Sequence, residues 1–191
     1  GAALSLWHKE LGKKRISSKQ DGMQGSYLGP SFSNHEIEES LISLKAKFKK
    51  LPDQDLLEVT ANELAKEKTI GWFQGKMEFG PRSLGSRSIL ADPRDNNMQK
   101  NLNLKVKFRE SFRPFAPSVL REDVCEWFEH DMDSPYMLLV ADVQKDKRRA
   151  ITNEEEALFG IDKLNVPRSS VPAITHVDYS ARIQTVHADT N

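Results

Sequence analysis

The 191-residue chain lacks several features that define common protein classes. It has one cysteine, so no internal disulfide can form, and we expect a reducing, cytoplasmic setting. No apolar run approaches the roughly 20 residues with which a helix crosses a bilayer. Lys plus Arg and Asp plus Glu each number 28, so no overall basic charge attracts nucleic acid or an anionic membrane.

Two common phosphate-binding motifs are absent as well. Neither G-x-x-x-x-G-K-[ST] nor G-x-G-x-x-G occurs, which excludes a Walker A loop and the dinucleotide-binding fingerprint. The start, Gly1-Ala2-Ala3-Leu4, has neither a Met nor the charged front and apolar stretch of a signal peptide. We therefore expect a segment cut from a longer chain, holding one domain and part of another.

The stretch Gly71–Leu90 is the most informative part of what the sequence contains. Apolar runs at residues 69–73 and 88–91 predict two strands. Residues that turn the chain or let backbone approach a ligand punctuate the loop between them: Gly75, Gly80, Pro81 and Gly85. Arg82 and Arg87 carry planar guanidinium groups that suit phosphate or carboxylate oxygens. The pattern predicts an anion-binding corner, although surface salt bridging is the common role of an arginine.

Basic charge gathers around this stretch. Nine Lys or Arg residues stand against four acidic residues between Lys76 and Arg113. Arg113 lies beside an apolar stretch, where an unpaired cation is costly, so a bound anion or a buried carboxylate is expected there. Arg94 could instead be satisfied by a neighbouring aspartate. Lys105 belongs to a basic run that could equally be a solvated helix face.

Four loop positions are further candidates. Lys76 and Gly80 lie in the loop beside the arginines, where a cation and a close backbone approach suit an anion. Glu78 could hold Mg²⁺ or an arginine, or be an exposed loop acid. Gln74 at a strand end could bind an amide or a nucleobase edge, or make an ordinary strand-end hydrogen bond.

The last third of the chain holds a histidine beside an acid. His176 and Asp178 straddle one residue of an expected strand, so both side chains leave the same face and could form an acid–base pair. A hydrogen-bonded core histidine is the commoner role. Arg182 lies just beyond the turn and could join them. Cys125 is expected to be a buried structural thiol on a helix face.

Hydrophobic periodicity predicts alternating helices and strands, which is typical of an α/β domain. A capping box at Ser33 and Glu36 predicts a helix start. Residues 13–30 are predicted to form a linker, and residues 144–170 are predicted to form a long charged loop. The expected helices cover residues 2–11, 33–44, 53–67, 97–106 and 122–129. Besides the two strands above, strands are expected at residues 45–51, 115–120 and 136–143, with a hairpin formed by 171–177 and 181–186.

The chain resembles a known family in several blocks. Residues 71–94 are similar to the signature of the carbamoyltransferase family typified by nodulation and antibiotic-tailoring enzymes. Further blocks follow in the same order: Phe112–Ser118, Ser134–Met137, Thr175–Asp178 and Ala181–Val186. The resemblance covers most of the chain, from Leu28 to Val186.

The resemblance implies a fold and a domain boundary. Residues 29–191 would form a domain similar to the YrdC/Sua5 fold, a twisted open mixed sheet with flanking helices, truncated at its C-terminus. Residues 1–28 would be the tail helix and linker of a preceding sugar-kinase-like domain, which would be a partner in the same chain. An iron-type metal is expected only in that preceding domain.

The resemblance also implies an activity. The family's second domain uses carbamoyl phosphate and ATP, with Mg²⁺, to make carbamoyl adenylate, and the carbamoyl group passes to a hydroxyl of a small molecule. The fragment alone is expected to lack that transfer. The predicted catalytic residues are Arg82, Arg87, Arg113 and His176. The predicted substrate or nucleotide ligands are Gln74, Lys76, Gly80, Arg94, Lys105 and Arg182.

Some positions depart from the family pattern, and other functions stay open. Ser83, Ser86 and Tyr179 stand where the family commonly has other residues, and Tyr179 weakens any claim of close backbone approach at that turn. One alternative is a YrdC-like module that binds RNA or a nucleotide without carbamoyltransferase activity, although nucleic acid is not the expected partner. Another is an interaction or sensor domain. A homodimer is also open, and no membrane partner is expected.

Overall fold

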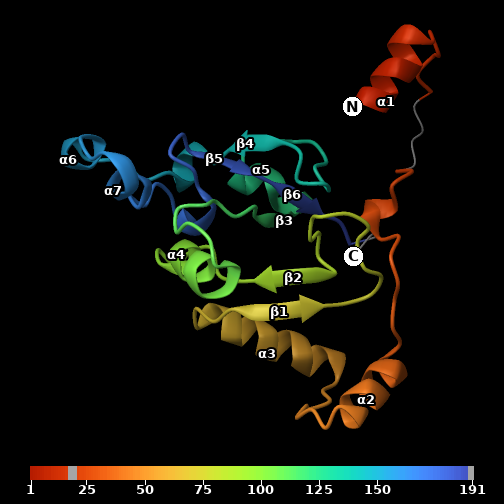
Figure 1. Ribbon diagram of the computed structural model, residues 1–191. Coiled ribbons are helices and arrows are strands. Elements are labelled where there is room, and N and C mark those ends of the chain that lie inside the picture. The colour runs from red at the N-terminus through yellow and green to blue at the C-terminus, as the bar shows by residue number, and fades with distance from the viewer. Residues whose placement is uncertain (17–20, 189–191) are drawn as a thin grey trace.

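The structure is a computed structural model that describes residues 1–16 and 21–188 (Figure 1). The α-helices are α1 (Ala2–Ser5), α2 (Asn34–Ser43), α3 (Asp53–Ala65), α4 (Met98–Leu102), α5 (Val124–Trp127), α6 (Asn153–Glu156) and α7 (Gly160–Leu164). Shorter or wider helical turns are η1 (Leu6–Glu10), η2 (Gln24–Ser26), η3 (Asn103–Lys107), η4 (Arg121–Asp123), η5 (Lys145–Lys147) and η6 (Pro172–Ile174). The strands are β1 (Ile70–Phe73), β2 (Arg87–Leu90), β3 (Ser118–Leu120), β4 (Val140–Asp142), β5 (Ser180–Arg182) and β6 (Gln184–Val186).

The strands pair in three short ladders. β1 and β2 are antiparallel, with Ile70 opposite Leu90 and Phe73 opposite Arg87. β4 and β5 are antiparallel, whereas β3 and β6 are parallel. Figure 1 shows α3 on one side of β1 and β2, with the other four strands and α5 on the opposite side. This mixture of helices with parallel and antiparallel strands confirms the predicted α/β class.

The core lies in the second half of the chain. Its main cluster joins α5, β4 and β5, and the side chains of Val124, Val143 and Ile183 are fully buried. A smaller cluster of Met98, Leu102 and Ala173 ties α4 to the turn η6. By contrast, none of α1, α2 or α3 contains a buried residue. These three helices therefore contribute little to the buried core.

Several predicted elements are confirmed. Ser33 caps α2 and Glu36 bonds back to the Ser33 N–H, as the capping box predicts. The helix predicted at residues 2–11 forms as α1 and η1 and stops at Gly12, whose φ is 63°. α3, α4 with η3, and η4 with α5 occupy the other predicted helices, and β1 and β2 occupy the predicted strand pair.

The predicted hairpin of residues 171–177 with 181–186 is wrong. Pro172 begins a 3₁₀ turn, because proline has no N–H to donate to a strand ladder. The two later strands pair instead with distant partners, β5 with β4 and β6 with β3. Ile183 between them is fully buried, so both ladders are drawn into one core.

Three smaller expectations also differ from the structure. Residues 45–51 form no strand, because their alternating lysines leave little apolar surface to bury. Cys125 is exposed rather than buried. Its Sγ lies 3.3 Å from an Asp131 carboxylate oxygen, and that hydrogen bond raises the pKa of the thiol. Residues 144–170 contain the short helices η5, α6 and α7 within the predicted loop.

No helix in the described part of the chain is long and apolar enough to span a membrane.

Candidate anion-binding site

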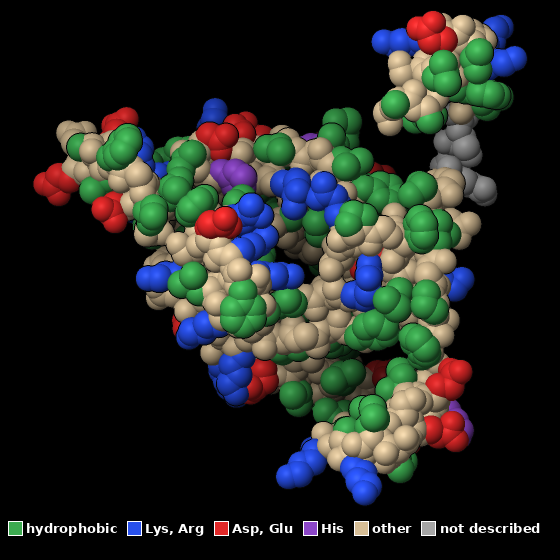
Figure 2. Space-filling model, in the orientation of Figure 1, with side chains coloured by type: hydrophobic (Ala, Val, Ile, Leu, Met, Phe, Trp, Pro, Cys, Tyr) green, Lys and Arg blue, Asp and Glu red, His purple; other side chains and the backbone are tan. Residues whose placement is uncertain are grey.

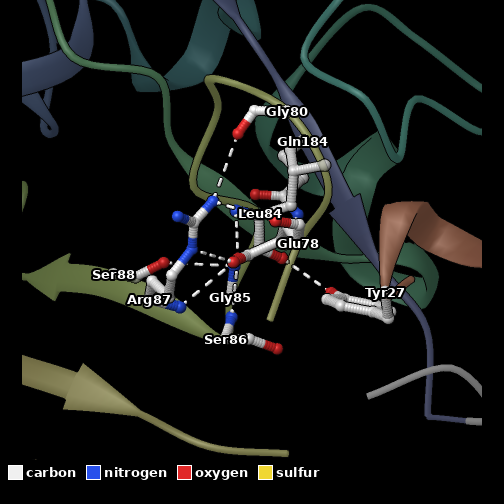
Figure 3. A network of polar contacts seen from close by, with 9 residues as sticks. All are labelled: Tyr27, Glu78, Gly80, Leu84, Gly85, Ser86, Arg87, Ser88 and Gln184. Atoms are coloured by element: carbon white, nitrogen blue, oxygen red, sulfur yellow. Dashed lines mark hydrogen bonds and ion pairs between the residues drawn. The ribbon is translucent and has the colours of Figure 1, made fainter. Parts of the chain in front are cut away.

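The loop between β1 and β2 is organised around one buried carboxylate, Glu78, which is 4% exposed. Its Oε1 accepts backbone N–H bonds from Leu84 at 2.7 Å, Ser86 at 2.9 Å and Arg87 at 3.3 Å. Its Oε2 accepts from Arg87 Nε at 2.8 Å (Figure 3). Burial opposes the charge on Glu78, but these bonds outweigh it, so the pKa of Glu78 lies below its ordinary value.

Arg87 holds this loop through side-chain hydrogen bonds from Nε and Nη2. Besides Glu78 Oε2, its guanidinium donates to the carbonyl oxygens of Glu78 at 3.1 Å and Gly80 at 3.2 Å. Gly80 and Gly85 have φ values of 121° and 127°, which L-residues with a Cβ rarely adopt, so the loop requires glycine at both positions. Arg87 therefore fixes the part of the loop from Glu78 to Gly80.

Leu84 is one of the buried residues of the loop. Its side chain is 3% exposed, and its carbonyl oxygen accepts two hydrogen bonds, from Tyr27 Oη and from Gln184 Nε2, each of 2.7 Å (Figure 3). Gln184 begins β6, and its Oε1 accepts from Ser118 Oγ on β3 at 3.1 Å. These bonds fix the loop against the β3–β6 ladder.

A cavity of about 400 Å³ opens between this loop and the strands of the core. Its lining contains four cationic side chains and no acidic one. The complete lining is Pro81, Arg82, Ser83, Gly85, Ser88, Ile89, Leu90, Lys107, Arg109, Pro114, Phe115, Ala116, Ser118, Met137, Arg182 and Gln184. We call it the cationic cavity. Figure 2 shows Lys and Arg side chains gathered around the central hollow of the molecule.

The cations of this cavity repel one another. Burial lowers the pKa of Arg182, and the charge of Arg82 lowers it further. Burial, followed by the charge of Arg113 outside the lining, lowers the pKa of Arg109. In the described part of the chain, Arg82, Lys107 and Arg182 have no carboxylate partner. Such an arrangement favours a polyanionic ligand, whose charge would offset the repulsion.

Arg109 is held in place by two contacts. Its Nε donates to Asn103 Oδ1 at 2.5 Å, and its guanidinium carbon lies 4.8 Å from the centre of the Phe115 ring. Asn103 is fully buried, and its amide also donates to the carbonyls of Ser111 and Arg113. A buried amide therefore sets the backbone that presents Arg109 to the cavity.

The structure brings only some of the predicted site residues into this cavity. Arg82 and Arg182 line it. Gly80 lies in the same loop, with its carbonyl bonded to Arg87. The sequence led us to expect Arg82 and Arg87 to converge on one anion; instead Arg87 holds Glu78 from within the loop.

The other predicted cations lie outside the cavity and have acidic neighbours or are exposed. Arg94 forms a bidentate pair with Asp92. Arg113 pairs with Glu110 at 3.0 Å, and both side chains are more than half exposed, so the carboxylate beside Arg113 is an exposed one rather than the expected buried one. Lys76 and Lys105 are exposed. The catalytic and binding roles of these residues stay predictions.

Gln74 and His176 also lie apart from the cavity lining. Gln74 is exposed, and its backbone N–H donates to Ser86 O at 3.0 Å. The His176 N–H donates to Ser180 O in a turn, not a strand, at 2.9 Å. The Asp178 carboxylate accepts from the hydroxyl and the N–H of Ser180, and these bonds lower its pKa. An acid–base pair of His176 and Asp178 stays a prediction.

Among the charged and amide side chains of the lining, three were not predicted as site residues: Lys107, Arg109 and Gln184. Lys107 and Arg109 belong to a basic run that the sequence does not distinguish from a solvated helix face. Gln184 lies within the last block of the family resemblance, which was the one signal that pointed to it. Their place at the cavity depends on contacts far apart in the chain.

The described residues contain no group of three or more His, Cys, Asp or Glu side chains that could hold a metal ion. Both Glu78 oxygens are occupied by Arg87 and backbone N–H groups, so the structure supports its role as an arginine partner. A Mg²⁺ ion at this cavity would depend on the oxygens of a bound phosphate for its ligands.

Comparison with known proteins finds a matching family model and several similar proteins. The family model described as Carbamoyltransferase C-terminus matches residues 61–191. The chain is 58% identical over 193 residues to the protein sll1178 of Synechocystis sp., covering 100% of this chain and 31% of that protein. It is 39% identical over 195 residues to Nodulation protein NolNO of Sinorhizobium fredii, covering 100% of this chain and 25% of that protein.

A third relative is the 3'-hydroxymethylcephem-O-carbamoyltransferase of Streptomyces clavuligerus, which is 36% identical over 131 residues, or 69% of this chain and 21% of the enzyme. The chain therefore belongs to the carbamoyltransferase family, in its C-terminal domain, which confirms the resemblance drawn from the motifs. It spans between 21% and 31% of the length of these relatives.

Proposed function

We propose that this domain binds carbamoyl phosphate and ATP in the cationic cavity and forms carbamoyl adenylate, from which a carbamoyl group passes to a hydroxyl of a small molecule. The observation that carries the proposal is the set of four cations, unopposed by an acid, lining one cavity of about 400 Å³. The family supplies the carbamoyl chemistry, since one relative is by name an O-carbamoyltransferase. We include a reducing, cytoplasmic setting in the proposal.

The chemistry suits such a cavity. Carbamoyl phosphate first loses its phosphate to water, which leaves carbamate. A carbamate oxygen then attacks the α-phosphate of ATP and pyrophosphate leaves, so the charge that develops on both leaving groups has to be stabilised. Preorganised cations in a partly dry site stabilise that charge more than water does. Arg82 and Arg182 are placed to bind phosphate oxygens, and Arg109 is preorganised by Asn103. Mg²⁺, when bound with ATP, would neutralise further phosphate charge.

A second, apolar cavity of about 260 Å³ adjoins the cationic one and supports a nucleotide ligand. The two share part of their lining, including Leu90 and Phe115. Beyond these residues the apolar cavity is lined by Leu64 of α3, Met98 and Leu102 of α4 and Ile174. Phosphates in one compartment and an apolar, flat group in the other match the two ends of ATP.

The preceding part of a longer chain is the proposed partner. The segment α1–η1 exposes Leu4, Leu6 and Trp7, each more than half accessible, and buries nothing. An exposed apolar helix of this kind normally packs on another surface. The relatives are several times longer than this chain, so a preceding sugar-kinase-like domain, with its own iron-type metal, is the proposed occupant. A monomer measured by light scattering would argue against the homodimer.

Titration calorimetry of ATP and of carbamoyl phosphate against the wild type and Arg82→Ala tests the proposal. Loss of one charge-assisted hydrogen bond is expected to weaken binding by about 10- to 100-fold. Arg121→Ala is the matched control, because Arg121 pairs with Asp131 and Asp133 outside the cavity lining. Absence of binding by folded wild type would contradict an active site for these substrates, and salt-sensitive RNA binding would favour the nucleic-acid alternative.

A further inference from the structure

The 21–30 segment lies within the predicted linker, and its residues 26–30 are hydrogen-bonded to the loop that carries Arg82. Three backbone hydrogen bonds join them: Gly29 N–H to Met77 O and Met77 N–H to Pro30 O, each 2.9 Å, and Phe79 N–H to Ser26 O, 2.7 Å. The first two both involve Met77, whose carbonyl accepts from Gly29 and whose N–H donates to the next residue, Pro30. A segment that only tethered two parts of a chain would not need such bonds.

The backbones at this contact are very close. A Cβ on Gly29 would lie 2.8 Å from Met77 O and 3.1 Å from Met77 Cβ. Any other residue at position 29 would therefore push the segment away from the loop. Glycine here serves the close approach of two backbones.

Tyr27 extends the contact to the inner end of the loop. Its hydroxyl donates to Leu84 O at 2.7 Å, the oxygen that also accepts from Gln184 Nε2 (Figure 3). Gln184 lines the cationic cavity, and Leu84 follows Arg82 by two residues. The Leu84 carbonyl is therefore held by β6 and by the 21–30 segment together.

The other end of the segment is fixed to the far wall of the cavity. The Asp21 carboxylate accepts from the hydroxyl of Tyr136 and, at 3.0 Å, from the N–H of Gly25. Tyr136 precedes Met137, which lines the cavity. Burial, together with the bond to Asp21, raises the pKa of Tyr136 to about 12, so its hydroxyl keeps its proton. The 21–30 segment thus spans from the Arg82 loop to the Met137 wall.

We infer that Tyr27 is a positioning residue for the cationic cavity, and that the 21–30 segment around it fixes the Leu84 bend and so the direction of Arg82. For its effect on ligand affinity this inference rests on the proposed function; for the geometry of the loop it does not.

The test is Tyr27→Phe, which removes one hydroxyl and keeps the ring. Hydrogen–deuterium exchange of a peptide covering residues 80–90 is expected to quicken, and calorimetry is expected to show pyrophosphate affinity falling about fivefold, the net effect of one neutral hydrogen bond. Gly29→Ala is expected to act in the same direction. Tyr179→Phe is the matched control, since the Tyr179 hydroxyl bonds Arg149 O at 3.4 Å away from the cavity.

The outcomes separate the two proposals. Faster exchange at residues 80–90 in Tyr27→Phe, with a wild type that binds no pyrophosphate, supports the positioning role and overturns only the proposed function. Unchanged exchange in Tyr27→Phe overturns the positioning role whatever the affinity. An affinity loss that is equal in Tyr179→Phe, or that follows a general drop in melting temperature, also overturns it.

Discussion

At the scale of single residues, the arginines of one sequence motif do two different things. Arg87 donates hydrogen bonds to the Glu78 carboxylate and to two backbone carbonyls. Arg82, five residues earlier, faces the cationic cavity. A buried carboxylate with backbone donors around it is a strong local constraint, because leaving any partner unpaired costs its full desolvation.

Replacing Glu78 tests this constraint. Glu78→Gln removes the charge that pairs with Arg87, and we expect the free energy of unfolding at pH 7 to fall by about 3 kcal/mol, typical of breaking a buried pair. Chemical denaturation of wild type and variant at that pH measures the loss. A loss no larger than that of Glu129→Gln, an exposed acid paired with Arg148, would contradict the role of Glu78.

The same variant makes a prediction about pH. The pKa of Glu78 is depressed below its unfolded value of 4.5, so its stabilisation is present above that pH and is lost as the pH falls through the folded pKa. The stability difference between wild type and Glu78→Gln should therefore shrink below about pH 4.5. A difference that stayed constant from pH 7 to pH 3 would mean that the charge of Glu78 is not what stabilises the loop.

At the scale of elements, α2 and α3, which precede β1, are stabilised by groups at their ends more than by burial of an apolar face. α2 has a complete capping box, yet none of its residues is buried. α3 begins after Pro52 with acidic residues in its first turn, Asp53 and Asp55, which favour the positive end of the helix dipole. Such helices open locally without unfolding the core.

Ser33→Ala is expected to destabilise α2 by about 1 kcal/mol, since the N3 backbone N–H loses its acceptor. Amide exchange within α2 should quicken about fivefold, which is that free energy expressed as a ratio. The global melting temperature should stay unchanged. Ser40→Ala, on the same helix away from the cap, is the control. A fall in melting temperature would show that α2 is coupled to the core.

At the scale of the whole molecule, stability is unevenly distributed. The fully buried apolar side chains belong to α5, β4 and the β5–β6 region, all in the second half of the chain. Figure 1 shows α1 apart from the rest of the molecule. The cavity lies where the loop between β1 and β2 meets that core, so its walls come from both halves.

Deletion of residues 1–16 is expected to leave the melting temperature of the remaining chain unchanged, because α1 and η1 bury no residue. Calorimetric melting of the shortened and the intact chain is the measurement. A clear decrease would show that α1–η1 contributes to the core. The 21–30 segment is retained in the deletion, so the Tyr27 bond to Leu84 is not disturbed.

The sequence by itself determined the α/β class, the strand pair around the glycine loop, the capping box and the family. These features depend on local patterns, such as the Ser33–Glu36 spacing, and on a long ordered set of motifs. It also predicted Arg82 as a catalytic residue and Arg182 as a ligand-binding one, although it predicted Arg87 and Arg113 as catalytic residues too.

Only the tertiary structure decided which cations share a cavity. Arg87 and Arg82 look alike along the chain, and the difference comes from Glu78, whose burial depends on packing. Lys107 and Arg109 reach the cavity because buried Asn103 fixes the chain behind them. The partners of β5 and β6 likewise lie some 40 and 66 residues away, and local periodicity carries no information on such distant pairings.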